Sequence, residues 1–99
     1  MAKPVLVTAK AKADLSAISD FTDATWGPPQ RRAYLGEIKT RMMALGLMPG
    51  LGRRRDELNP GWRTLPCGSH VILYIERDDR IEILRVFHGR QDIARAPEE

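Results

Sequence analysis

The residues best suited to chemistry in this sequence are its arginines. Of the 16 basic residues, 12 are arginine and 4 are lysine. A guanidinium group donates planar, paired hydrogen bonds to carboxylate or phosphate groups, so this composition is typical of a protein with an anionic partner. Arg53, Arg54 and Arg55 form the densest run, beside Asp56 and Glu57. We interpret the run as a solvated loop or as a docking site for an acidic protein segment, in preference to a site for a phosphate backbone.

Histidine and cysteine are scarce. His70, His88 and the single Cys67 are all that the chain contains, so the sequence predicts no intrachain disulfide, no Cys/His zinc cluster, and no metal or cofactor. His88 ends a predicted strand, where it could act as an acid or base or simply cap backbone groups. We interpret His70 as structural and Cys67 as inert.

The length and charge of the chain predict one small domain over residues 1–99. It carries 16 basic and 13 acidic residues, a net charge of +3, and 42% hydrophobic residues. The first fifty residues hold the whole excess of positive charge, which serves either solubility or an anionic partner. No apolar run approaches the roughly 20 residues of a membrane span, and the N-terminus lacks a secretory segment, so we expect a cytoplasmic protein.

Two helices are predicted in the first half of the chain. Apolar residues recur at helical spacing up to Trp26, after a short strand at 5–7 and an N-cap at Thr8. Gly27 and two prolines end this helix and begin a second, which runs about five turns to the vicinity of Gly46. The core stripe of the second helix consists of Tyr34, Ile38, Met42 and Leu45.

The second half of the chain predicts a surface loop and then strands. Residues 49–61 are rich in glycine and proline, and segments 62–67, 70–77 and 80–88 are separated by two-residue turns. In the last segment, simple alternation places Ile81, Ile83, Arg85 and Phe87 on one face. We therefore predict an α+β domain: an N-terminal strand, a helical hairpin and a three-strand meander, with the hairpin packed on a small antiparallel sheet and a frayed tail at 94–99.

Six segments of the chain resemble, in order and spacing, the ParE branch of the ParE/RelE toxin superfamily. The resemblance covers roughly residues 5–95. Toxins of this family form one half of bacterial type II toxin–antitoxin pairs, and their fold is a helical hairpin on a four-stranded antiparallel sheet. The segments are AKADL (11–15), WG (26–27), LMPGLG (47–52), LNPGWR (58–63), SHVILY (69–74) and ILRVFHGRQD (83–92).

The resemblance implies a toxin that causes growth arrest by poisoning DNA gyrase. It also implies neutralisation by a ParD-like antitoxin, which has a ribbon-helix-helix DNA-binding half and a flexible half that wraps the toxin. It implies no sequence-specific nucleic-acid binding by the toxin alone. The RelE branch shares the fold but cuts messenger RNA on the ribosome, so fold alone cannot choose between them. A non-toxic regulatory binder of the antitoxin is a third alternative.

An RNA-cleaving site needs a base, an acid and cations around the phosphate. Arg63, Arg85 and Arg90 could supply the positive charge, and His88 the acid or base. RelE-like enzymes usually carry a tyrosine, or a Glu/His pair, near the C-terminus as well, and residues 91–99 contain no aromatic residue. This departure favours the gyrase-binding branch and a protein that is not an enzyme.

The same residues are our candidates for binding the target or antitoxin: Arg63, Arg85, His88 and Arg90, with Arg53, Arg54 and Arg55 in support. The alternative for Arg63 and Arg85 is a cross-strand ion pair with Glu76 or Glu82, which contributes little to stability. Apolar residues left exposed on the hairpin, such as Leu35 or Met43, would form a groove for a partner helix.

Overall fold

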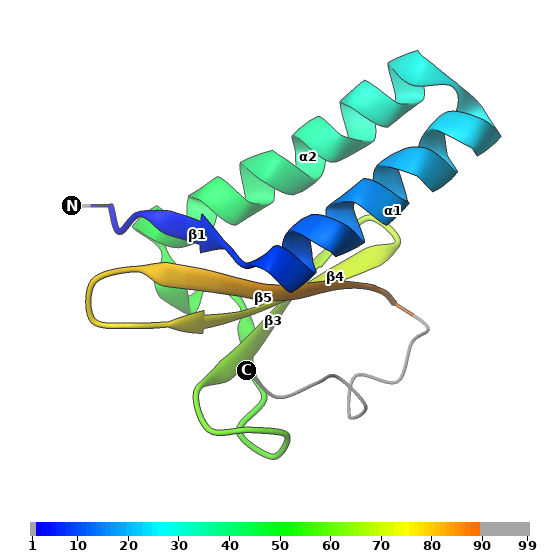
Figure 1. The fold of residues 1–99 in the computed structure, drawn as a ribbon. Coiled ribbons are helices and arrows are strands. Elements are labelled where there is room, and N and C mark those ends of the chain that lie inside the picture. Colours follow the sequence, from blue (N-terminus) through cyan, green and yellow to red (C-terminus); the bar gives the residue numbers. More distant parts are fainter. Residues whose placement is uncertain (1, 90–99) are drawn as a thin grey trace.

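The computed structural model describes residues 2–89 and has the predicted α+β architecture (Figure 1). The predictions for Arg90 and for the tail at 94–99 lie outside these residues. No helix within 2–89 is long and apolar enough to cross a membrane. The elements are β1 (Val5–Val7), α1 (Ala9–Trp26), α2 (Pro28–Leu47), the 3₁₀ turn η1 (Pro49–Leu51), β2 (Arg53–Arg54), β3 (Trp62–Cys67), β4 (His70–Glu76) and β5 (Ile81–His88).

The helical hairpin forms as predicted from the residues that begin and end its two helices. The Thr8 hydroxyl accepts the N–H of Ala11 at 3.3 Å, which caps α1, and donates to the carbonyl of Ile83 at 2.8 Å. Gly27 has φ +90°, a conformation that costs glycine little, and Pro28 follows as the first residue of α2. One residue thus joins the two helices, and they fold back antiparallel to each other (Figure 1).

The sheet has five strands in the order β1-β5-β4-β3-β2 and is mixed, so the prediction of a purely antiparallel sheet is wrong at β1. β1 runs parallel to β5 with Val5 opposite Ile81. The helices and the other three strands separate β1 from β5 in sequence, and a connection of that length allows parallel pairing.

The predicted loop at 49–61 also contains regular structure. Pro49–Leu51 forms η1, and Arg53–Arg54 forms β2 at the edge of the sheet, with Arg53 opposite Thr64. The N–H of Gly52 donates to the hydroxyl of the buried Tyr74 at 2.8 Å, which ties this segment to β4. Sequence composition missed it because β2 has only two residues and both are arginine.

A β-bulge interrupts the pairing of β4 with β5. Tyr74 lies opposite Ile83, but Leu73 lies opposite Arg85, so Leu84 is an additional residue on β5. Beyond this point every β5 side chain is displaced by one position relative to simple alternation. The predicted common face for Ile83 and Arg85 is therefore wrong.

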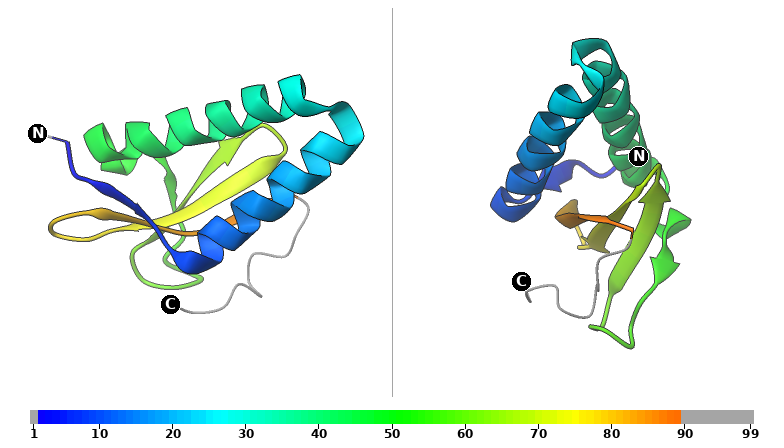
Figure 2. Two further views of the ribbon diagram at one scale, coloured as in Figure 1. Left: turned by 45° about the horizontal axis from the view of Figure 1, so that its top comes forward. Right: turned by 90° about the vertical axis from the view of Figure 1, so that its right-hand side faces the viewer.

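Two apolar clusters lie on opposite faces of the sheet. The larger one packs under both helices, which cover the same face (Figure 2), and includes Ile38, Leu45, Ile72, Ile83 and Val86. The smaller one forms on the other face from Trp62, Leu73, Ile75, Leu84 and Phe87, with Leu58 packed against it.

Candidate functional site

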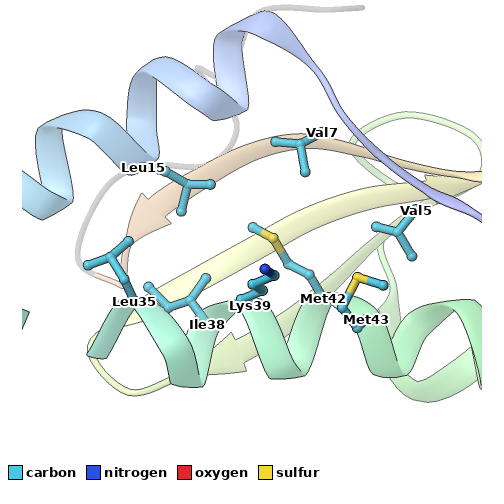
Figure 3. Close-up of a pocket in the computed structure, with 8 residues that line it drawn as sticks. All are labelled: Val5, Val7, Leu15, Leu35, Ile38, Lys39, Met42 and Met43. Atoms are coloured by element: carbon cyan, nitrogen blue, oxygen red, sulfur yellow. The ribbon is translucent and has the colours of Figure 1, made fainter. Parts of the chain in front are cut away.

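An apolar groove opens between the two helices and β1 (Figure 3). Its volume is about 310 Å³, and its lining carries one charged side chain, Lys39. The side chains of Val7 and Leu15 face those of α2 across it (Figure 3). The lining residues are Val5, Val7, Leu15, Leu35, Ile38, Lys39, Met42 and Met43.

The groove exists because the helices meet at Gly27 and diverge toward β1 (Figure 2). Leu35 and Met43, the two hairpin residues that the sequence suggested for a partner helix, both line it. Leu35 is half-buried, and 55% of Met43 is exposed. Ile38 and Met42 form the floor from the buried core stripe of α2. An apolar surface of this kind is a docking site for an apolar segment.

Arg85 is engaged by α1 and not by a neighbouring strand. Its Nε and Nη2 donate to the two carboxylate oxygens of Asp14 at 2.7 and 2.9 Å. The same carboxylate accepts the N–H of Val86 at 2.9 Å. β1 pairs with β5 only as far as Ile83, and Asp14 supplies an acceptor for one N–H of the β5 edge beyond it. The predicted pairing of Arg85 with Glu76 or Glu82 is wrong.

Arg63 is also held by an unpredicted partner. Its guanidinium Nη1 donates to the carbonyl of Gly52 at 2.8 Å, bridging β3 to the start of β2. Glu76 forms its ion pair with Lys3 at 2.8 Å, and Glu82 forms ion pairs with two arginines of the β4–β5 turn. The two glutamates are thus paired elsewhere, and neither acts as the cross-strand partner of Arg63.

Three of the four residues proposed for RNA cleavage, Arg63, Arg85 and His88, lie within residues 2–89. Arg63 lies opposite Tyr74 and Arg85 lies opposite Leu73, and these two β4 neighbours belong to clusters on opposite faces of the sheet. His88 pairs with His70, four residues along β4 from Tyr74, or about 13 Å at the rise of a strand. Arg63, Arg85 and His88 therefore occupy separate positions on the sheet.

The triple arginine is partly neutralised by its own neighbours. Arg54 donates to Asp56 at 2.8 Å and Arg55 to Glu57 at 2.8 Å. These hydrogen bonds hold the pKa values of both carboxyl groups below their usual values, with the backbone N–H of Gly61 as the larger cause at Asp56. The segment therefore presents less net charge than three arginines suggest.

A second concavity, the histidine cleft, lies under the hairpin at the end of the sheet. It has a volume of about 280 Å³ and adjoins a hollow of about 250 Å³ that shares Phe21, His70 and His88. Phe21 and Trp26 of α1 are 68% and 69% exposed at its rim. The lining residues are Phe21, Thr22, Trp26, Gln30, Tyr34, Ser69, His70 and His88.

Tyr34 organises the floor of the histidine cleft. Its hydroxyl lies 2.6 Å from Nδ1 of His70, accepts the N–H of Ser69 at 3.0 Å, and donates to the carbonyl of Cys67 at 3.4 Å. Burial raises the pKa of Tyr34, and burial together with the nearby His88 lowers the pKa of His70. The His70 and His88 rings are edge to face, with centroids 5.4 Å apart.

Sequence reasoning missed this cluster because it assigned Tyr34 to the core stripe of the second helix and interpreted the two histidines separately. A strand register counted outward from the turn at Asp78 and Asp79 places Phe87 opposite His70. The bulge at Leu84 moves the register by one and places His88 there instead. The turn was readable from the sequence, but the bulge was not.

With this geometry established, the family model described as ParE toxin of the type II toxin-antitoxin system parDE matches residues 5–93. The chain belongs to the ParE toxin family. Toxin ParE1 of Mycobacterium tuberculosis is 35% identical over 96 residues, which cover 96% of this chain and 98% of that protein. Toxin ParE1 of Caulobacter vibrioides is 35% identical over 86 residues, covering 87% and 88% of the two chains.

Solved structures agree with this assignment to the ParE family. A chain of the chromosomal ParDE system of P. aeruginosa has a TM-score of 0.76 and 28% identity, and the match covers 87% of this chain and 95% of that one. A chain of the RelBE2 toxin–antitoxin complex of Mycobacterium tuberculosis has a TM-score of 0.65 at 24% identity, covering 89% and 99%. The second match shows the shared fold alone, and the α+β ParE/RelE-like fold expected from the sequence is confirmed.

Proposed function

We propose that this ParE-family toxin acts by binding DNA gyrase and is neutralised by a ParD-like antitoxin that occupies the apolar groove. The observation that carries the proposal is the groove itself, an opening of about 310 Å³ whose lining is apolar except for Lys39. A small domain rarely leaves such a surface without a partner. Family membership supplies the kind of partner, the antitoxin of a type II pair.

The groove also specifies the chemistry of the antitoxin segment. An amphipathic helix would place apolar residues against Leu15, Leu35 and Met43, at the i, i+3, i+4 spacing of one helical face. Lys39 lies among these residues, so an acidic residue on the helix would pair with it. A segment that folds on binding would gain its affinity from these contacts while its disordered form stays soluble.

Two methionines of the toxin provide a matched test of the antitoxin site. Met43 lines the groove and is 55% exposed, whereas Met48 is 56% exposed and lies outside the lining. We expect Met43→Asp to weaken binding of the cognate antitoxin by more than about tenfold in calorimetry, because it buries a charge against apolar groups. Met48→Asp should bind like the wild type. Equal affinities of the wild type and both variants for the antitoxin would exclude the groove as the antitoxin-binding site.

The gyrase proposal is tested with purified components. We expect the toxin to inhibit supercoiling by gyrase and to cause cleaved DNA to accumulate, and a stoichiometric amount of antitoxin to reverse both effects. The separation of Arg63 from His88 supports a binding mode over catalysis. Unchanged supercoiling at a large excess of toxin would overturn the proposal, and transcript cleavage in a translating extract would establish the ribonuclease alternative.

Expression of the protein without its antitoxin distinguishes a gyrase-binding toxin from the third alternative, a non-toxic regulatory binder of the antitoxin. A gyrase-binding toxin should arrest growth, and the arrest should disappear when the antitoxin is supplied. Normal growth with a folded, abundant product would instead favour a regulatory binder that acts only with its antitoxin.

A further inference from the structure

We propose that Tyr34, His70 and His88 form a pH-sensitive latch between α2 and the turn that joins β3 to β4. The latch holds while His70 is neutral and releases when His70 takes up a proton. His70 and His88 are the only histidines in the sequence, and they lie directly opposite each other on β4 and β5. Because histidine ordinarily changes its charge between pH 5 and 8, both such side chains of the protein meet at this one site.

Tyr34 is the part of the latch that α2 contributes. Its hydroxyl accepts the N–H of Ser69 at 3.0 Å and donates to the carbonyl of Cys67 at 3.4 Å, so it contacts the backbone on both sides of the turn. Gly68, between these two residues, has φ +58°, and a Cβ there would lie 2.6 Å from the Tyr34 ring. The lack of a side chain at Gly68 therefore lets the ring pack directly against the turn.

His70 shares the same hydroxyl. Its Nδ1 lies 2.6 Å from the Tyr34 oxygen, and because that oxygen directs its proton to Cys67, it can accept the proton of Nδ1. A further proton must then go to Nε2, which makes the ring a cation. Burial disfavours that cation and the nearby His88 opposes it further, so the pKa of His70 lies below its usual value of 6.5.

The groups around His70 offer this cation no carboxylate. The titratable side chains that face it are Tyr34 of α2, Cys67 of β3 and His88 of β5, whose ring centroid is 5.4 Å away. Those that α1 contributes to the two hollows do not titrate, and Glu37 and Arg41 of α2 act on Cys67 from outside the lining. Within residues 2–89, no carboxylate, lysine or arginine lines either hollow, so a proton on His70 has no anionic partner there.

Protonation of His70 therefore favours an open arrangement. When α2 and the turn separate, water reaches the imidazole and its pKa returns toward the usual value. A group that binds its proton more readily in the open state shifts the equilibrium toward that state as the pH falls. The latched form thus has its full stability above about pH 6.5 and loses stability as the pH falls below it.

Two backbone amides provide a matched test in the wild-type protein. The N–H of Ser69 donates to the Tyr34 hydroxyl, whereas the N–H of Gly52 donates to the hydroxyl of Tyr74 at 2.8 Å, away from both histidines. Nuclear magnetic resonance follows hydrogen exchange at both amides, corrected for the intrinsic effect of pH, between pH 8 and pH 5. We expect Ser69 to lose protection severalfold as His70 titrates, and Gly52 to keep its protection.

The same spectra measure the titration of the imidazoles. We expect His70 to titrate below pH 6.5, and His88→Gln to move that titration upward because it removes the opposing imidazole. The proposal is overturned if wild-type His70 titrates at or above 6.5, or if the protection of Ser69 does not change with pH. Loss of protection at Ser69 and Gly52 in parallel would also overturn it, because that result indicates global unfolding.

Thermal unfolding of variants gives an independent readout. Between pH 7.5 and 5.5 the Tm of the wild type should fall, and in His70→Gln, which cannot become a cation, the fall should be about half as large or smaller. Tyr34→Phe removes the shared oxygen, so the amide of Ser69 should be unprotected at both pH values. An equal fall in Tm for the wild type and His70→Gln would contradict the latch.

Discussion

The carboxylate of Asp14 accepts hydrogen bonds from three donors, two on the Arg85 guanidinium and one on the Val86 backbone. Both side chains are largely buried, with exposed fractions of 16% for Asp14 and 22% for Arg85. A buried pair of this kind stabilises the fold chiefly because removing one member leaves the other without a partner. The pair of Asp14 and Arg85 therefore fastens α1 to β5.

We predict that Asp14→Ala lowers the free energy of unfolding by about 2–3 kcal/mol, because it leaves the Arg85 guanidinium and the Val86 N–H unsatisfied. For a domain of this size the Tm should fall by about 10 °C or more. Asp20→Ala, on the same helix but exposed, is the matched control and should change little. Equal effects of the two substitutions would contradict the structural role of Asp14.

The lowered pKa of Glu82 makes the free energy of unfolding depend on pH. Its carboxylate accepts hydrogen bonds from Arg77 at 2.9 Å and Arg80 at 3.0 Å, and the Arg77 bond is the larger cause of its lowered pKa. A carboxyl group whose pKa is lower in the folded state contributes stability above its unfolded pKa of about 4.5 and loses it as the pH falls through the folded value.

We expect Glu82→Gln to cost about 1 kcal/mol at pH 7, since an amide cannot replace the charge that the arginines contact. The difference from the wild type should shrink steadily below pH 4.5. Urea unfolding at pH 7 and pH 3 measures both values. A difference that is the same at both pH values would show that the charge of Glu82 contributes nothing.

At the scale of elements, α2 carries two glycines in different surroundings. A Cβ at Gly46 would lie 2.5 Å from the carbonyl oxygen of Lys3, which also precedes β1, whereas a Cβ at Gly36 would meet nothing within 4 Å. The N–H of Lys3 donates to the carbonyl of Gly46 at 2.8 Å, so the two segments are in direct backbone contact. Gly46 thus permits the close approach that forms one wall of the apolar groove.

We predict opposite effects of alanine at these two positions. Gly36→Ala should raise the free energy of unfolding by about 0.5–1 kcal/mol, because alanine is the better helix former and the site is open. Gly46→Ala should lower it by about 1–3 kcal/mol, since the backbone before β1 must move. Thermal unfolding of the two variants tests both signs. Stabilisation by Gly46→Ala would show that β1 is not held against α2 as described.

At the scale of the whole molecule, the net charge of +3 and the segment around β2 bear on how partners approach. Arg54 and Arg55 are paired with their neighbours, so we expect the segment to act over distance more than through close contacts. Electrostatic attraction of this kind raises association rates and weakens as salt increases.

We predict that replacing Arg53, Arg54 and Arg55 together with glutamine slows antitoxin association severalfold at low salt. The effect should largely vanish near 0.5 M salt, where the Debye length is roughly 4 Å. Dissociation should stay close to the wild-type rate. Stopped-flow or surface-binding kinetics at two salt concentrations separate these rates, and a large change in dissociation alone would place the arginines in direct contact with the antitoxin.

The sequence by itself determined the fold class, the hairpin and the meander, because these follow from local signals: apolar periodicity, the Thr8 cap, the break at Gly27 and two-residue turns. It also indicated the toxin family. Tertiary structure alone decided which side chains meet. The parallel pairing of β1, the engagement of Arg85 by Asp14, and the bulge that places His88 beside His70 depend on contacts between residues 18 to 76 positions apart, which no local pattern encodes.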